Sequence, residues 1–254
     1  MAAHRRLIIR PGAIGDFILS LPALRCLKTE YLELWAAAQN LPLARFADQT
    51  RSIASTGLDM LEFDPRPDLI TSLRSFDSII SWYGTNRPEF RKLVQSLDLP
   101  FQFFTALPPQ GLALHAADFF LQQAQTITRC RDDGIPRIEV PRRGGEFAVI
   151  HPFAGSTEKR WPLERFQQLA GRLERQMPVR WCAGPEDSLP GAVRIENLYE
   201  LGCWLAMARL YIGNDSGITH LAAAVGTPVI ALFGPTDPRV WAPRGPNVRV
   251  IQMR

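Results

Sequence analysis

Short apolar segments alternate with helical patterns along most of this 254-residue chain, and no other feature of the sequence restricts the fold as strongly. The first unit is an apolar strand at 6–10, a turn that carries Gly12 and Gly15, and a helical pattern at 17–28. Repeated strand–helix units of this kind are typical of a mostly parallel sheet with helices on its faces. The chain is therefore predicted to be an α/β protein.

The same alternation predicts the remaining elements of regular structure. Strands are expected at 32–36, 52–55, 78–82, 147–151, 179–183, 193–197, 209–213, 229–233 and 248–252. Helices are expected at 41–49, 88–97, 115–128, 162–176, 199–208 and 218–225.

A segment rich in Pro, Gly and Arg at 136–146 is the best candidate for a domain boundary. We therefore predict two Rossmann-like domains that face a central cleft, one at 1–140 and the other at 141–254. In open α/β sheets, ligands bind beyond the carboxyl ends of the strands. The strand-to-helix loops are thus where functional residues are expected.

Composition and spacing exclude several classes of protein. No apolar run approaches the ~18 residues of a membrane span, and no leader cleavage site follows the N-terminus, so a cytoplasmic protein is expected. The four cysteines lie far apart without a C-x-x-C pair and the histidines lack metal-ligand spacing, so neither a disulfide framework nor a zinc site is indicated. The net charge of +4 is too small and dispersed to predict nucleic-acid binding, but it suits a polyanionic small molecule or a phosphate-bearing membrane surface.

The loop at 214–217 opens a helix of small residues and is the first candidate binding site. The N–H groups of a first helical turn, together with the hydroxyls of Ser216 and Thr219, suit a phosphate or diphosphate, and Gly217 permits close backbone approach. His220 could add a donor. The alternative, that Asp215 or Ser216 only caps the helix, is equally favoured by this loop alone and is compatible with anion binding.

The loop at 155–162 is polar and basic and also precedes a helix. It lacks the G-x-x-x-x-G-K-[ST] spacing, so it is not a P-loop. Lys159 or Arg160 could supply a positive charge to a phosphate, and an ordinary solvated loop is the alternative.

Asp16 directly follows Gly15 at the start of the first predicted helix. The helix N-terminus stabilises an ionised carboxylate, and a simple capping role is the commoner explanation for an acidic residue there. If Asp16 faces the second domain across a cleft, it can instead accept a proton from a hydroxyl nucleophile. The G-A-I-G sequence lacks the third glycine of a dinucleotide fingerprint, and no G-x-S-x-G elbow or D-x-D pair is present.

Taken together, these loops resemble glycosyltransferase family 9, the ADP-heptose:lipopolysaccharide heptosyltransferase family of bacteria, whose members have the two-domain GT-B fold. The resemblance rests on four motifs. They are RPGAIGDFILSLPAL at 10–24, HPFAGSTEKRWP at 151–162, AGPED at 183–187 and GNDSGITHLAAAVGTPVIALFGPTDP at 213–238. The last motif is long and very specific.

The resemblance assigns a role to each matching residue. It implies that Asp16 is the catalytic base, that Lys159 contacts the donor phosphates, and that Glu186 lies near the nucleotide ribose. The residues that match the diphosphate-binding loop are Ser216, Gly217 and His220, with Asp215 shaping that loop or lying close to the donor sugar. Compared with the family, the chain is shorter in the acceptor-binding N-terminal half and in the helices that follow the last strand.

The function expected from the resemblance is an inverting, metal-independent transfer of a sugar, by family default heptose, from a nucleotide-diphosphate sugar. The acceptor would be a hydroxyl of a lipid-linked or lipopolysaccharide-type cell-envelope glycan, with peripheral contact with the inner membrane surface and no cofactor or nucleic acid. The first alternative is a nucleotide-sugar-binding protein that has lost transfer because its acceptor half is reduced. A sugar-nucleotide epimerase is the second, and the sequence singles out no further acid and base for it.

Overall fold

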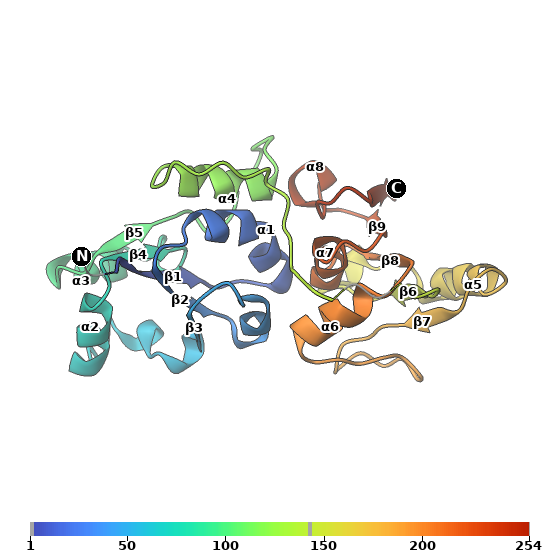
Figure 1. Cartoon of the computed structure of the whole chain (residues 1–254), viewed down its shortest axis with the longest axis horizontal. Coiled ribbons are helices and arrows are strands. Elements are labelled where there is room, and N and C mark those ends of the chain that lie inside the picture. Colours follow the sequence, from blue (N-terminus) through green and yellow to red (C-terminus); the bar gives the residue numbers. More distant parts are fainter. Residues whose placement is uncertain (1–2, 142–143, 254) are drawn as a thin grey trace.

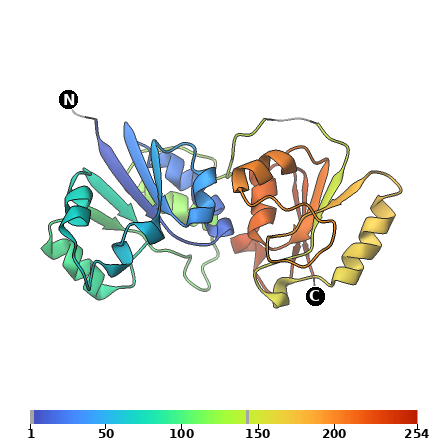
Figure 2. The same ribbon diagram turned by 90° about the horizontal axis from the view of Figure 1, so that it is seen from below.

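The described part of the chain forms ten strands in two separate parallel sheets that lie side by side (Figures 1 and 2). The computed structural model describes residues 3–141 and 144–253. The first sheet has the order β3-β2-β1-β4-β5 and the second the order β10-β9-β8-β6-β7, and every described pairing is parallel. The strands are β1 (Arg5–Arg10), β2 (Tyr31–Ala36), β3 (Gln49–Ser52), β4 (Ser78–Ser81), β5 (Phe101–Phe103), β6 (Ala148–His151), β7 (Val179–Trp181), β8 (Leu210–Asn214), β9 (Val229–Phe233) and β10 (Val248–Gln252). The predicted α/β class is therefore confirmed.

The helices connect these parallel strands. They are α1 (Ile14–Cys26), α2 (Pro67–Arg74), α3 (Pro88–Ser96), α4 (Ala116–Gln125), α5 (Leu163–Leu173), α6 (Leu198–Leu205), α7 (Gly217–Ala224) and α8 (Pro238–Trp241). Short 3-10 turns are η1 (Ala38–Leu43), η2 (Ile53–Ser55), η3 (Leu58–Met60) and η4 (Thr157–Lys159). No helix within the described part of the chain combines the length and apolar character that crossing a bilayer needs.

Helix α1 joins the two lobes of the molecule. Most of its residues are buried, because it packs against α4 in its own lobe and against α7 in the other. A helix that is apolar on all sides is typical of a fully enclosed position. One cluster of buried side chains accordingly runs from Phe17 and Phe120 in the first lobe to Leu221 and Ala224 in the second. This shared core brings the N-terminus of α1 next to that of α7 (Figure 1).

Several predicted elements differ from those observed. The predicted helix at 41–49 is a 3-10 turn, and the neighbouring strand lies at Gln49–Ser52 rather than at 52–55. Strand β3 is a polar edge strand, so no apolar run marks it. The predicted strand at 193–197 is reduced to a single bridge between Cys182 and Val193. Helix α2 and strand β5 were not predicted, since both are short and polar on their outer sides.

The segment between α4 and β6 contains the predicted domain boundary, and its described residues form no helix or strand. It contacts the second lobe where the N–H of Ile138 donates to the carbonyl of Ala224 at 2.9 Å. Residues 142–143, at the centre of the predicted linker, lie outside the described residues. The division into 1–140 and 141–254 remains our proposal for the two domains.

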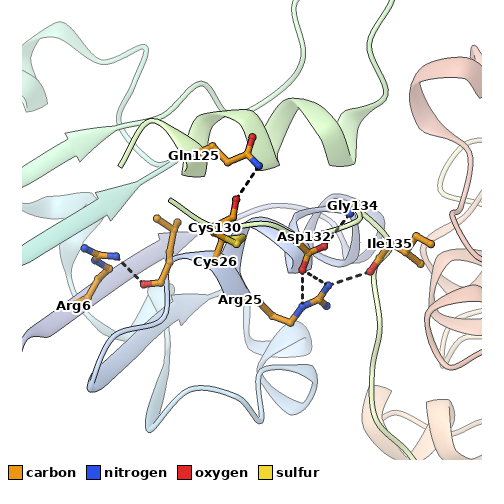
Figure 3. The surroundings of a disulfide bond; sticks show 9 residues. Arg6, Arg25, Cys26, Gln125, Cys130, Asp132, Gly134 and Ile135 are labelled. Carbon is orange, nitrogen blue, oxygen red and sulfur yellow. Dashed lines mark hydrogen bonds and ion pairs between the residues drawn. A yellow bond between two sulfur atoms is a disulfide. The ribbon is translucent and has the colours of Figure 1, made fainter. Parts of the chain in front are cut away.

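The structure corrects the expectation about cysteines, because Cys26 and Cys130 form a disulfide (Figure 3). The two residues are 104 positions apart, and only the packing of α4 on α1 brings their Cα atoms to 5.5 Å. No local sequence spacing could have indicated this pairing. Next to it, Arg25 binds the carboxylate of Asp132 at 2.9 Å and donates to the carbonyl of Ile135 at 3.1 Å, so the end of α1 is tied to the segment after α4 at several points.

Candidate active site

Two adjoining cavities lie between the lobes, at the carboxyl ends of the strands. The first, of about 500 Å³, is lined by Ala13, Gly15, Asp16, Leu19 and Leu107 from the first lobe and by Gly155, Ser156, Lys159, Asp215, Ser216, Gly217, His220, Thr236 and Trp241 from the second. The second, of about 780 Å³, shares Ala13, Gly15, Gly155, Ser216 and Gly217 with it. Both are built on strand-to-helix loops, where the topology of parallel sheets predicts ligand sites.

Two glycines allow the lobes to meet at this point. A Cβ atom on Gly217 would lie 2.6 Å from the Cβ of Ile14, and one on Gly15 would lie 3.1 Å from the Cδ2 of His220. Only residues without side chains therefore permit this approach of α1 and α7. As a result, the positive ends of both helices face the first cavity.

Asp16 is the third residue of α1, and its half-buried side chain lines the first cavity. The residue at the cap position is Ala13, so Asp16 is not the helix cap that the commoner sequence interpretation assumed. Burial raises the pKa of the Asp16 carboxyl, while Arg10, the backbone N–H of Ala13 and Lys159 oppose that rise. The carboxylate thus faces the second lobe across the cleft, as general-base chemistry requires.

Lys159 and Asp215 form an ion pair opposite Asp16. The Nζ of Lys159 lies 2.7 Å from the Oδ2 of Asp215, whose side chain is only 6% exposed. Lys159 comes from the turn η4, and Asp215 directly follows β8. Because Lys159 keeps one third of its side-chain surface exposed, its ammonium can also reach a ligand in the cavity.

The loop after β8 both caps its helix and faces the cavity. Ser216 is the N-cap of α7, and its hydroxyl accepts from the N–H of Thr219 at 3.4 Å. The first N–H groups of any helix lack an intrahelical acceptor, so those of Gly217 and Ile218 are available to an anion. Capping and anion binding therefore coexist here.

Thr219 and Arg160 were predicted as donor-binding residues, but both hydrogen-bond within the protein. The hydroxyl of Thr219 is fully buried and bonds to the carbonyl of Asn214 and to the hydroxyl of Tyr211. The guanidinium of Arg160 donates twice to the carbonyl of Ala154, at 3.0 and 2.8 Å. Thr219 thus shapes the loop that carries the site, whereas Arg160 also lines the second cavity and its contact with the donor stays a prediction.

His220 closes the floor of the first cavity and is only 5% exposed. Burial lowers the pKa of its imidazole to about 4, so the ring is neutral at neutral pH. Its Nδ1 has no hydrogen-bond partner within the described parts of the chain. That nitrogen is itself buried, so the cavity is lined by a neutral imidazole and not by an imidazolium.

The second cavity extends away from Asp16 and combines apolar and acidic groups. It contains Glu186 as well as His151, Phe153 and Glu196. The backbone N–H of Gly184 donates to Asp187 at 2.9 Å, which fixes the turn that presents Glu186. Such a mixed lining suits a flat heterocycle with a hydroxylated ring attached.

Sequence reasoning missed several residues of the site. Thr236 and Trp241 line the first cavity from the loop after β9 and from α8, and the rule of strand carboxyl ends could have found Thr236. The effect of Arg10 on the pKa of Asp16 could not have been found, since Arg10 lies behind the cavity and reads as an ordinary strand residue. Over residues 3–141 and 144–253, no group of three or more His, Cys, Asp or Glu side chains could hold a metal ion.

Solved structures with the same arrangement define the class of the fold. The glycosyltransferase of family 9 from Veillonella parvula superposes with a TM-score of 0.77 at 18% identity, over 98% of this chain and 86% of that one. The E. coli heptosyltransferase WaaC with ADP gives 0.74 at 18% identity, over 98% and 93%. The two facing parallel α/β lobes are therefore a GT-B fold, as predicted.

Sequence comparison then gives the family. The model of glycosyltransferase family 9 (heptosyltransferase) matches residues 107–254. Lipopolysaccharide heptosyltransferase 2 of Salmonella typhimurium is 34% identical over 97% of this chain and 87% of its own length. The chain belongs to glycosyltransferase family 9.

The relatives are longer than this chain. Lipopolysaccharide heptosyltransferase 3 of E. coli K12 is 33% identical over 40% of this chain, and the match covers 35% of that relative. The alignment with the Salmonella relative extends over 312 positions, more than the 254 residues present here, so that relative contains segments that this chain lacks.

Proposed function

We propose that this protein transfers a sugar from a nucleotide-diphosphate sugar, of the ADP-heptose type, to a hydroxyl of a lipopolysaccharide-type acceptor. The observation that carries the proposal is one cavity in which Asp16 from the first lobe faces Lys159, Asp215 and the N-terminus of α7 from the second. A base on one side, and an ammonium and the positive end of a helix on the other, are what displacement of a diphosphate requires.

The donor would occupy both cavities. The nucleoside suits the larger cavity, where Phe153 offers a ring face and Glu186 an acceptor for ribose hydroxyls. The diphosphate would lie where the cavities join, against the N–H groups of Gly217 and Ile218 and the ammonium of Lys159. The sugar would then extend toward Asp16 and His220.

The transfer would proceed by a single displacement with inversion. The acceptor oxygen forms a bond to the anomeric carbon while the bond from that carbon to the diphosphate oxygen breaks, and the Asp16 carboxylate takes the hydroxyl proton. The negative charge that develops on the nucleoside diphosphate is stabilised by Lys159 and the end of α7, which supports a reaction without a metal. A positioned base of this kind contributes about 10²- to 10⁴-fold to the rate.

The proposal is tested with ADP-heptose as donor and extracted heptose-deficient lipopolysaccharide as acceptor. Wild type should release ADP and glycosylate the acceptor. Asp16→Asn should lose at least 100-fold in turnover while its ADP affinity changes less than threefold. Asp68→Asn is the matched control, because Asp68 is an exposed aspartate in the first turn of α2.

Each outcome of this assay has a defined meaning. Full turnover in Asp16→Asn rejects Asp16 as the base. ADP-heptose binding by wild type without transfer to any acceptor favours the alternative of a nucleotide-sugar-binding protein. Contact with a membrane surface and a cytoplasmic location stay predictions, supported by the net charge of +4 and by the lipid-linked acceptor proposed here.

A further inference from the structure

Arg10 is a buried cation directly behind the proposed base. It is the last residue of β1 and only 2% of its surface is exposed. Its guanidinium donates to the carbonyl of Pro11 and to the backbone carbonyl of Asp16, both at 3.0 Å. The two hydrogen bonds therefore close the turn that begins after β1 and ends at Asp16.

Aromatic rings enclose the rest of the guanidinium. Its carbon lies 4.6 Å from the ring centre of Phe120 on α4 and 5.5 Å from that of Trp82, which follows β4. Within the described residues, no carboxylate lies within ion-pair distance of Arg10, and its Nε has no hydrogen-bond partner. Burying a cation in this way costs free energy, so its position calls for an explanation in terms of the neighbouring site.

The side chain of Asp16 is the acidic group that acts on the Arg10 guanidinium. A Cβ atom placed on Gly12 would lie 3.6 Å from the Nη1 of Arg10 and 3.7 Å from the Oδ2 of Asp16, so these two atoms are less than about 7.5 Å apart. At this distance and in a partly buried setting, a cation stabilises the ionised form of a carboxylate. Lys159 acts in the same direction from η4, Asp215 acts against it from the loop after β8, and His220 on α7 is neutral.

We propose that Arg10 is the positioning residue for Asp16: it fixes the 11–16 turn so that the carboxylate points into the cavity, and its buried charge keeps that carboxylate ionised. This inference rests on the proposed role of Asp16 as base. Arg10 itself does not line either cavity between the lobes, so it acts through Asp16 and does not touch the substrate.

The test compares Arg10→Met and Arg10→Lys with wild type in the ADP-release assay over pH 4–9. Arg10→Met should move the acid limb of the kcat profile up by about one pH unit or more and lower kcat at neutral pH at least tenfold. The KM for ADP-heptose should change less than threefold, because the proposed donor contacts come from the other lobe. Arg10→Lys keeps the charge, so its acid limb should stay within about 0.3 units of wild type while kcat still falls.

Arg6→Met is the matched control. Arg6 is also a buried arginine on β1, but its guanidinium donates to the carbonyl of Leu27 and to the hydroxyl of Ser78, away from the site. Its loss should lower the thermal midpoint without moving the pH profile. An acid limb that is unchanged in Arg10→Met, or that shifts equally in Arg6→Met, overturns the inference.

Two further results keep this test separate from that of the proposed function. If Asp16→Asn abolishes turnover and Arg10→Met leaves the profile unchanged, only the role of Arg10 is rejected. If Asp16→Asn keeps turnover, the base assignment itself fails. If Arg10→Met does not fold, the test uses Arg10→Lys alone. In that variant kcat should fall while the KM for ADP-heptose stays unchanged. An unaltered kcat rejects the inference.

Discussion

Replacing Cys130 with serine removes the covalent link between the end of α1 and the segment that follows α4. The disulfide closes a loop of 104 residues, and in the chain-entropy model a loop of this length is worth about 4.7 kcal/mol at 25 °C. For a chain of this size each kcal/mol corresponds to roughly 2–4 °C in Tm, so Cys130→Ser should melt about 10–20 °C below the oxidised wild type.

The assay is thermal unfolding of the oxidised protein, with and without dithiothreitol, followed by circular dichroism. Cys203→Ser is the control, since Cys203 is a free, half-buried cysteine. Wild type in reductant should melt like Cys130→Ser, and Cys203→Ser should stay close to oxidised wild type. Mass spectrometry establishes whether the bond is intact. Equal Tm values for intact wild type and Cys130→Ser would refute the loop-entropy reasoning.

Four other measurements examine the site. Because burial raises the pKa of Asp16, kcat should decline as pH falls through a value above that of an ordinary aspartate, and an acid limb below pH 4 would contradict this. Lys159→Ala should weaken ADP binding about tenfold or more but leave adenosine binding nearly unchanged in calorimetry; equal losses would make the role of Lys159 structural. Gly217→Ala places a methyl group 2.6 Å from the Cβ of Ile14, so it should cost about 1–3 kcal/mol in urea unfolding, and a neutral result would mean that the lobes separate freely. His220 has a pKa of about 4 when folded and about 6.5 when unfolded, so the unfolded state binds more protons between these values, and His220 should lower stability by up to roughly 3 kcal/mol from pH 6.5 to 4. Burial also lowers the pKa of His115 and His151, so His220→Gln should reduce the loss of stability without abolishing it, and an unchanged loss would contradict the assignment.

The sequence predicted the sheets well because their central strands are apolar runs. Buried strands such as β8 and β9 stand out between polar loops, and the parallel order follows from the helices between them. Edge elements carry no such signal: β3 alternates between exposed and half-buried residues, and α2 has only two buried residues. The positions of these elements depend on their contacts with the rest of the lobe and not on a local pattern.

The site was predictable where position along the chain decides it, and unpredictable where three-dimensional packing does. Asp16, Lys159 and Gly217 lie on the connections that follow β1, β6 and β8, or in the first turn of the next helix, so the topology places them at the cleft. The sequence could not show that the hydroxyl of Thr219 points into the core while that of Ser216 faces the cavity, because this depends on how α7 packs. The partners of Arg10 come from the turn after β1, from α1 and from α4, and no local pattern joins them.

The contact of Gly15 and Gly217 at the cleft divides the chemistry between two halves of one chain. Recognition of the nucleotide would reside in one half and proton removal in the other. A fragment that carries either sheet alone would hold an incomplete set of groups. Two fragments produced separately would regain turnover only in proportion to how well they reassociate.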